Sequence, residues 1–491
     1  MKTCVVSIVL AGGLMVPVVA GDQRDAEIAE LRSMVESLRG EVDVLRAEDS
    51  EQWITEQRSE HIRSIVNDVL ADADTRASLQ GNGATSGYNK GFFIQSTDGN
   101  WKFKMNGQIQ ARYMYNHAKD QPNDYGAEIR RLKLKFSGHI IDPSYTYKIS
   151  IINQRDTQGS AGNSNTMYVE DAWLQKKMDN DWYVKIGQFK APFLREELVS
   201  SSAQLTVERS MINNQFTYGW TQGVELGTKS ENLWLRGMFT DGPNASNRQS
   251  QGTDDDQMSM VARADYMLAG SWSDWKTLTG YGTKSDISAF IGGAFQWFNA
   301  SNRGTTATEF GGANALRSYG FTVDASVGND QWTAYTAFVW ADNGGATNAP
   351  LPDTNTAFGW IAQGGLMVAE DWQIFGRWEL GDISKYSQGN AGWANGQMPI
   401  PTPPGTQPRL GNDGMRTGHN ATLTVGFNNW IAGKNLKWTT DFGYAFSTLN
   451  NGGGGTSLPR ADYVSSGNGW RDDNAGQAGQ ILVRTQLQLV F

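Results

Sequence analysis

The chain has very few cysteines, histidines and prolines for its length of 491 residues. Cys4 is the single cysteine, and the four histidines show neither an HExxH motif nor i,i+4 pairing, so we expect no metal site. No segment after the first twenty residues offers the 18 or so apolar residues that a membrane-spanning helix needs. A GxSxG elbow and a P-loop are absent too, and no nucleophile has a visible base. We expect no catalysis, no cofactor and no nucleic-acid partner.

Aromatic residues and glycine are abundant instead. The chain holds 18 Trp, 16 Tyr and 20 Phe, and 56 Gly against 13 Pro, while only 39% of its residues are hydrophobic. An aromatic-rich, glycine-rich chain with few aliphatic runs is typical of many strands joined by turns.

The first twenty residues have the pattern of a secretory signal peptide. Lys2 supplies a positive charge, residues 5–19 are mostly apolar, and Val18-Val19-Ala20 forms a small-residue cleavage site. A single-pass anchor is the alternative, but the apolar run is short and interrupted by glycine and proline. We expect the mature chain to begin at Gly21. Because Cys4 leaves with the signal peptide, the exported chain would carry no thiol.

Residues 22–80 have the period of a coiled coil. Apolar residues recur at spacings of 3,4,3,4,3, which are heptad positions a and d: Ile28, Leu31, Val35, Leu38, Val42 and Leu45. The spacing resumes at Ile62, Ile65 and Val69. The segment holds 15 Asp and Glu against 7 Arg, a net charge of −8, which leaves −2 for residues 81–491. A helix packed on a domain is the alternative, but the charged residues between these positions favour self-association. A Gly/Ser/Asn-rich linker is expected over residues 81–100.

After residue 100 the apolar period changes to 2. In residues 101–115 apolar and polar residues alternate for longer than the roughly 9 to 11 residues that a tilted strand needs to cross a bilayer. Such segments number sixteen, with starts near residues 101, 127, 144, 165, 181, 219, 232, 257, 286, 315, 330, 356, 371, 416, 436 and 479. Only the stretch 269–286 fits either a turn or part of a strand.

Short turns and long polar loops alternate between these strands. An even strand number with alternating connections is the topology of outer-membrane barrels, and sixteen strands leave an aqueous channel. We therefore expect an all-β fold: a 16-stranded antiparallel transmembrane β-barrel over residues 101–491, in the bacterial outer membrane. Both ends of the chain would then lie in the periplasm, and the N-terminal coiled-coil helix with them.

Tryptophans follow the short turns. Trp275 follows a turn that matches this pattern less closely, and six tryptophans match it well: Trp101, Trp182, Trp234, Trp332, Trp372 and Trp438. A tryptophan just past a tight turn is typical of the aromatic girdle that contacts lipid at the membrane interface. We expect the six at one rim of the barrel. The chain also ends on an aromatic residue, Phe491, as outer-membrane barrels typically do.

Basic residues gather on the faces expected to line the lumen. Residues 101–150 hold nine Lys and Arg against four Asp and Glu. Arg130 has lipid-facing parity, so it lies at the rim or a β-bulge precedes Arg131. Successive cations can hold an anion at several weak sites, a solvated polar face being the alternative. The expected pore-lining cations are Lys102, Lys104, Arg112, Arg130, Arg131, Lys133, Lys135, Lys148 and Lys185.

The connection at residues 190–218 is unusually long. Its apolar residues argue against disorder, and we expect it to fold into the barrel and narrow it, an exposed surface loop being the alternative. Lys190 and Arg195 at its start would add to the anion-binding set.

Several of these segments resemble the phosphate-selective porin O and P family. Residues 186–193 (IGQFKAPF) and 205–210 (LTVERS) look like its constriction loop, and residues 107–113 (GQIQARY) and 129–138 (IRRLKLKFSG) look like its first two strands. The last of these includes the paired arginines that help form the family's anion eyelet. The resemblance spans roughly residues 90–491. It implies a trimeric, sixteen-stranded, anion-selective porin.

The expected function is passive diffusion of phosphate or similar small anions through a homotrimer embedded in outer-membrane lipid. A general, non-selective porin is one alternative. A second is an envelope tether in which residues 22–80 bind peptidoglycan or another periplasmic partner. A barrel-borne lipase or protease is the rival class, for which His139 and His419 are the only histidines in or near predicted strands of the barrel.

Overall fold

The structure, a computed structural model, describes most of the chain in two compact units, residues 1–83 and 84–491. The described residues are 21–52, 63–64, 84–119, 121–154, 167–243, 256–301, 316–344, 355–382, 419–447, 449, 467–471 and 478–491. The expected signal peptide and the second 3,4 run around Ile65 lie outside them.

In the N-terminal unit the described residues form a long helix, α1 (Gly21–Gln52). Its heptad residues Leu31, Val35, Leu38 and Val42 are 46–60% exposed in the single chain. The helix therefore carries an apolar stripe without a partner in the part of this unit that the structure describes. No helix among the described residues is long and apolar enough to cross a membrane.

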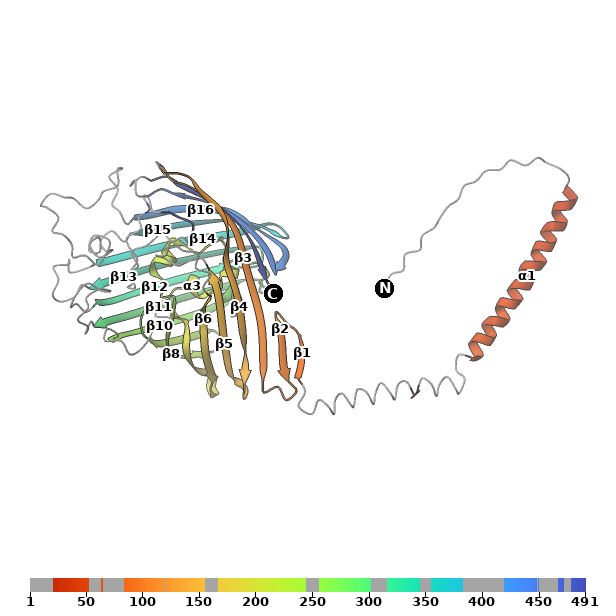
Figure 1. The fold of residues 1–491 in the computed structure, drawn as a ribbon, viewed down its shortest axis with the longest axis horizontal. Coiled ribbons are helices and arrows are strands. Elements are labelled where there is room, and N and C mark those ends of the chain that lie inside the picture. The colour runs from red at the N-terminus through yellow and green to blue at the C-terminus, as the bar shows by residue number, and fades with distance from the viewer. Residues whose placement is uncertain are drawn as a thin grey trace. The chain divides into compact units, whose positions relative to one another are not determined.

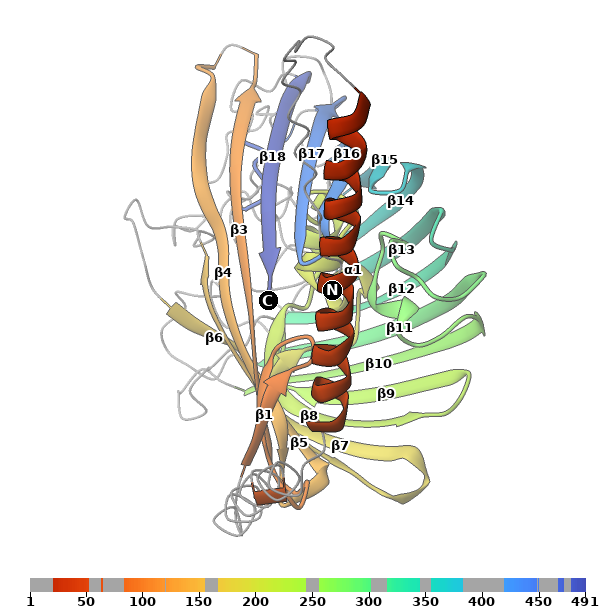
Figure 2. The same ribbon diagram turned by 90° about the vertical axis from the view of Figure 1, so that its right-hand side faces the viewer.

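Strands β3 to β18 form a closed antiparallel barrel of sixteen strands (Figure 1). β18 pairs with β3, and the two strands lie side by side in Figure 2. Every strand starts within three residues of its predicted position. Residues 270–287 are a connection rather than a strand. The strands are β3 (Lys102–His117), β4 (Asp124–Ile140), β5 (Asp142–Gln154), β6 (Met167–Lys177), β7 (Trp182–Lys190), β8 (Trp220–Lys229), β9 (Leu233–Thr240), β10 (Asp256–Ala269), β11 (Ser288–Ser301), β12 (Leu316–Gly328), β13 (Trp332–Gly344), β14 (Asn355–Ala369), β15 (Trp372–Asp382), β16 (His419–Lys434), β17 (Leu436–Ala445) and β18 (Gln480–Val490).

Two further strands lie within the predicted linker. β1 (Ala84–Tyr88) and β2 (Phe92–Ser96) form a hairpin, and β2 pairs with β3 from Lys102 to Met105 (Figure 1). β18 pairs with β3 only from Gln108 to His117, so β2 completes an edge of β3 that would otherwise be open. The linker prediction was wrong for residues 84–96. The glycines and asparagines of this segment favoured a linker, but the segment contains two short strands.

The last residue closes the seam between β18 and β3. Gly107 and Phe491 exchange two backbone hydrogen bonds, of 2.8 and 3.1 Å. A Cβ atom on Gly107 would lie 2.1 Å from the Phe491 ring, so this approach requires glycine.

The strands are apolar outside and polar inside, as their alternation predicts. On β11 and β12, Ile291, Phe295 and Val323 are about half exposed on the outer face, while Gln296 and Thr322 are buried on the inner face. The apolar outer face suits a lipid environment.

All six tryptophans predicted for one rim lie at the same end of the barrel. Trp182, Trp332, Trp372 and Trp438 lie at or near the starts of strands that run in one direction, Trp101 directly precedes another, and all five are 37–54% exposed. Trp234 also lies at this end, but it shares the inner face with Arg236, whose guanidinium carbon is 3.9 Å from its ring. Trp234 therefore lies at the predicted rim but on the lumen side, and Trp275, which was not among the six, is 3% exposed.

Three connections that the structure describes, in whole or in part, enter the barrel. Residues 191–219 hold α3 (Arg195–Leu198), the 3-10 turn η2 (Ser201–Ala203) and α4 (Met211–Phe216), and nearly all of them are buried, so the predicted inward fold is confirmed (Figure 1). We call this segment the constriction loop. Residues 270–287 contact it through Leu278, whose N–H donates to the Ala203 carbonyl at 3.0 Å. Residues 467–471 enter between β17 and β18, with Trp470 buried against Gly443.

Candidate functional site at the constriction

The two adjacent arginines of β4 both face the lumen because of a β-bulge. Gln110 of β3 pairs with Arg131, and the next residue, Ala111, pairs with Ile129, so Arg130 is the extra residue. Arg130 and Arg131 are 3% and 5% exposed, while Ile129 is 53% exposed on the outer face. The parity of Arg130 allowed either a position at the rim or a β-bulge before Arg131, and the structure has the bulge.

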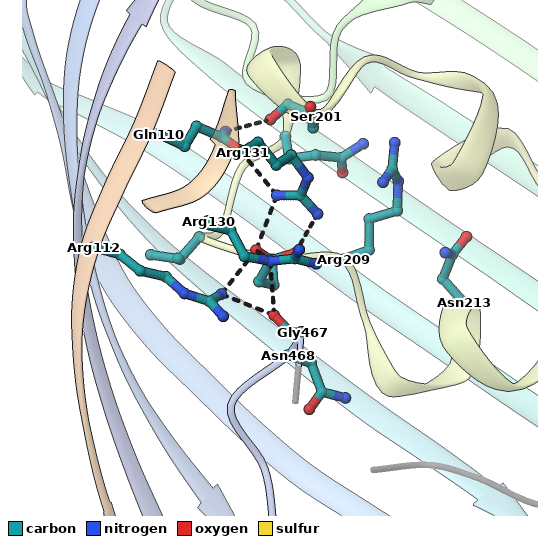
Figure 3. A network of polar contacts seen from close by, with 12 residues as sticks. Gln110, Arg112, Arg130, Arg131, Ser201, Arg209, Asn213, Gly467 and Asn468 are labelled. Atoms are coloured by element: carbon teal, nitrogen blue, oxygen red, sulfur yellow. Dashed lines mark hydrogen bonds and ion pairs between the residues drawn. The ribbon is translucent and has the colours of Figure 1, made fainter. Parts of the chain in front are cut away.

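Three arginines from the barrel wall converge on one carboxylate of the constriction loop. Arg131 grips Glu208 with both ends of its guanidinium, Nη1 to Oε1 at 2.9 Å and Nη2 to Oε2 at 2.7 Å. Arg130 Nε and Arg112 Nη1 each lie 2.8 Å from Oε1. Figure 3 shows Arg112, Arg130 and Arg131 pointing toward one another from β3 and β4. We call Arg112, Arg130 and Arg131 the arginine triad.

Further acceptors surround the arginine triad. Arg112 also binds Glu128, and Arg131 donates to Gln110 Oε1 at 2.9 Å. The carbonyl of Gly467 accepts from Arg112 at 2.8 Å and from Arg130 at 3.1 Å (Figure 3). The segment 467–471 thus lies directly on the arginine triad. No pattern in the sequence pointed to this contact.

Two carboxylates of the constriction loop, Glu208 and Glu197, have lowered pKa values in spite of their burial. Burial alone would raise the pKa of Glu208, but Arg130, Arg131 and Arg112 hold it well below its usual range. Burial would likewise raise the pKa of Glu197, yet Arg209 and Lys190 lower it to about 2.

Four of the predicted pore-lining lysines form ion pairs. Their amines lie 2.6–2.7 Å from carboxylate oxygens, in the pairs Lys133–Glu170, Lys148–Asp171, Lys185–Glu225 and Lys190–Glu197. Strand parity predicted where these lysines lie but not their partners. Their charge is therefore largely compensated locally.

Three other predicted lysines are differently placed. Lys135 contacts Gln108 Oε1 at 3.4 Å, and the Lys102 amine lies 4.8 Å from the centre of the Phe93 ring. Lys104 lies on the inner face of β3, as Lys102 does. Asn106, the next residue on that face after Lys104, pairs with Lys135 of the neighbouring strand β4. In the described part of the chain no ion pair joins any of the three to a carboxylate.

Arg195 belongs to a separate cluster on the opposite wall. It donates to Ser326 Oγ at 2.6 Å, and its guanidinium carbon lies 5.2 Å from the ring centres of Trp275 and Phe290. Close by, Arg263 bridges Asp265 and Asp324, at 2.6 and 2.7 Å, and Arg236 also binds Asp265. These partners on β9, β10 and β12 were not among the predicted residues, although strand parity would have placed them inside. Arg195 fixes the start of the constriction loop here, away from the arginine triad.

The far side of the constriction loop is held by β15, β16 and β17. Glu379 accepts from the Met211 N–H at 2.7 Å, and Asp441 accepts from the Val207 N–H at 3.0 Å. Asn428 and Lys437 donate to carbonyls of the loop, at 2.9 and 3.0 Å. The loop is thus fastened on opposite walls, and its position in the lumen is fixed.

The predicted histidines do not assemble a catalytic set in the described structure. The His139 ring contacts the carbonyl of Gly99 in the turn before β3, at 2.8 Å, and the His419 side chain lies outside the described residues. The described residues also include no group of three or more His, Cys, Asp or Glu that could hold a metal ion.

A closed sixteen-stranded barrel with an apolar outer face, a polar lumen and an inserted loop defines a porin, which forms a channel across the outer membrane. The family model described as phosphate-selective porin O and P matches residues 103–451, and the chain belongs to this family. The resemblance seen in the sequence is thereby confirmed.

Solved porin structures are similar to this chain at low sequence identity. An anion-selective porin from Comamonas acidovorans is 12% identical, with 79% of this chain and 99% of that chain covered and a TM-score of 0.49. OmpF of Salmonella typhi, in complex with daunomycin, is 11% identical over 83% and 100% of the two chains, with a TM-score of 0.47. OmpT of Vibrio cholerae is 10% identical over 80% and 98%, with a TM-score of 0.45. No curated protein matches.

Proposed function

We propose that this porin prefers anions and passes phosphate or similar small anions by passive diffusion. The observation that carries the proposal is the row of lumen lysines, Lys102, Lys104 and Lys135, which lack carboxylate partners among the described residues. Uncompensated charge in a narrow, partly low-dielectric passage acts on ions more strongly than the same charge on an open surface.

These lysines lead along β3 and β4 toward the arginine triad. A lysine amine is a mobile point charge, so successive lysines offer anions weak sites that do not trap them. We assign two kinds of cation to the framework of the pathway: the lysines paired with carboxylates, Lys133, Lys148, Lys185 and Lys190, and Arg195, which anchors the start of the constriction loop. The family to which the chain belongs is described as phosphate-selective, which agrees with this proposal.

The test replaces the three lysines Lys102, Lys104 and Lys135 by glutamate and measures the reversal potential of single channels in a salt gradient. We expect the anion preference to be lost or reversed, because six units of charge change in the lumen while the wet lumen face tolerates the substitutions. The matched control replaces the same lysines by arginine, which keeps the charge and should keep the preference. An unchanged reversal potential in the glutamate variant would refute the role of these lysines in anion preference and would favour a general, non-selective porin.

We also propose that the barrels assemble as homotrimers in the outer membrane and that α1 forms a coiled coil in the periplasm. Trimers are what the family resemblance implies. The exposed stripe of Leu31, Val35, Leu38 and Val42 supports self-association of α1, because apolar side chains at a and d positions need a second helix to bury them.

A further inference from the structure

We propose that Glu208 is a built-in occupant of the arginine triad: a carboxylate, tethered to the constriction loop, that fills a site shaped for an oxyanion with two or more oxygens. The inference rests on the proposed anion pathway for its place in transport. Its structural content, that the arginine triad binds oxyanions once Glu208 is removed, can be tested separately.

The geometry around Glu208 is that of a bound oxyanion. Arg131 engages both of its oxygens through a two-pronged contact, the arrangement by which guanidinium groups bind carboxylate and phosphate. Arg130 and Arg112 add two further charged hydrogen bonds, each of 2.8 Å, to Oε1. The three arginines belong to the barrel wall, whereas the carboxylate arrives on a connection, so the ligand and the site are separate parts of the chain.

Glu208 differs from the other buried lumen carboxylates that the structure describes. Glu170 and Glu225 each hold a single lysine, Lys133 and Lys185, at 2.7 Å. Asp265 binds two arginines, and Glu208 binds three. Removing Glu208 would take from three buried guanidinium groups the carboxylate that they share. Buried charge of that kind is costly unless a counter-ion enters.

The tether gives Glu208 an advantage over free anions. A group linked to the same chain competes at a high effective concentration, and a permeating anion must displace it to reach all three arginines. The arginine triad is therefore kept from binding anions tightly, and anions pass it on weak contacts, as conduction requires. Glu208 also holds its part of the constriction loop against β3 and β4.

The test compares the full-length protein with its Glu208→Ala and Glu208→Gln variants, using inorganic phosphate and sulfate as probes. Thermal unfolding in detergent is measured in chloride and then in phosphate or sulfate at equal ionic strength. We expect both variants to unfold at lower temperature than the wild type in chloride. The oxyanions should restore much of the loss in Glu208→Ala, where the vacated space can hold them, and should shift the wild type little.

Single-channel recording gives a second readout. Phosphate should reduce the chloride current of Glu208→Gln at a concentration on the order of 10-fold lower than in the wild type, a ratio within the usual range for coupled binding. Glu208→Gln keeps the size of the side chain, so this measurement remains available if Glu208→Ala fails to fold.

The matched control is Glu225→Ala, which removes a buried lumen carboxylate that holds one lysine. Its stability should not respond to phosphate or sulfate beyond the response of the wild type. The inference is overturned if no oxyanion restores Glu208→Ala and phosphate blocks Glu208→Gln no better than the wild type, or if Glu225→Ala responds equally. A wild-type channel without anion preference would refute the proposed function but not the occupancy of the arginine triad by Glu208.

Discussion

A single inserted residue determines the chemistry of the constriction. With regular alternation, one of Arg130 and Arg131 would face lipid, and the bulge opposite Gln110 and Ala111 turns both inward. The sequence of β4 left two placements open for Arg130. Alternation along one strand cannot decide between them, because a bulge is defined by the register with the neighbouring strand.

Pairing of charges was the part of the site that the sequence did not reveal. The alternation of β4 correctly placed Lys133 and Lys135 on the inner face, but Lys133 binds Glu170 of β6 whereas Lys135 contacts an amide. Whether a lumen cation is compensated depends on side chains of other strands and of the constriction loop. Composition alone, nine basic against four acidic residues in residues 101–150, overstates the uncompensated charge.

Glu197 makes the stability of the constriction loop sensitive to acid. Its folded pKa of about 2 lies below the ordinary value for glutamate, about 4.3, so its ionised form stabilises the folded state above that ordinary value. This contribution is lost as the pH falls from about 4 toward 2. The wild type should exceed Glu197→Gln in stability at pH 7, by on the order of 3 kcal/mol, and the difference should vanish near pH 2. Thermal unfolding across this range measures it, and a constant difference would contradict the assignment.

At the scale of elements, α1 carries a charge pattern suited to copies of itself. With Val35 and Val42 at a and with Leu31 and Leu38 at d, Arg32 and Arg39 fall at e and Glu41 at g. The sequence continues this pattern with Glu27 at g and Arg46 at e. In a parallel coiled coil the g residues of one helix face the e residues of its partner, so that Glu27 and Glu41 would face Arg32 and Arg46 of the partner. An antiparallel pair would set arginine against arginine.

We therefore expect Leu31→Cys to form a disulfide-linked dimer of the exported protein in cell envelopes, because equivalent d residues meet in a parallel coiled coil. Non-reducing electrophoresis measures the dimer. Ser33→Cys, at an outward f position of the same helix, is the control and should form no disulfide-linked dimer under the same oxidation. Equal cross-linking at both positions would indicate random collision instead of a coiled coil.

The inward connections show what length alone can and cannot predict. The constriction loop was predicted because it is long and rich in apolar residues. Residues 270–287 are also long but fitted a strand equally well, and they enter the lumen through Leu278 and Tyr281, whose ring stacks on Trp430 at 4.1 Å. Residues 467–471 lie within a polar connection whose sequence resembles that of an ordinary external loop. Their burial depends on the fit of Trp470 over Gly443 and Leu482, which no local pattern encodes.

For the whole molecule, the number of strands and their starts followed from the sequence because lipid imposes a strict alternation on every strand. The β1–β2 hairpin did not follow, since it fills a vacant edge that depends on where β18 stops pairing with β3. The same contrast holds inside the barrel. The outward face was predictable from hydrophobicity, whereas the contents of the lumen depend on contacts between distant residues.

Deletion of residues 22–80 should weaken the proposed trimer without abolishing it, because contacts between barrels would lie mainly in residues 101–491. Size-exclusion chromatography with light scattering in detergent, at falling protein concentration, compares the two forms. A full-length protein that is monomeric at all concentrations would refute the trimer. A deletion variant that dissociates completely would assign the assembly to α1.

The anchoring of the constriction loop on late strands has a consequence for biogenesis. Val207 is held by Asp441, 234 residues later in the chain, and Ser202 by Gln488, 286 residues later. A nascent sheet that has not yet acquired β17 and β18 lacks these anchors on its far wall. The pairing of β18 with β3 closes the barrel, and the same step therefore completes the set of contacts that anchor the constriction loop. An intermediate without the last strand would have a wide lumen in which the constriction loop is not yet fixed, and the addition of that strand produces the narrowed channel.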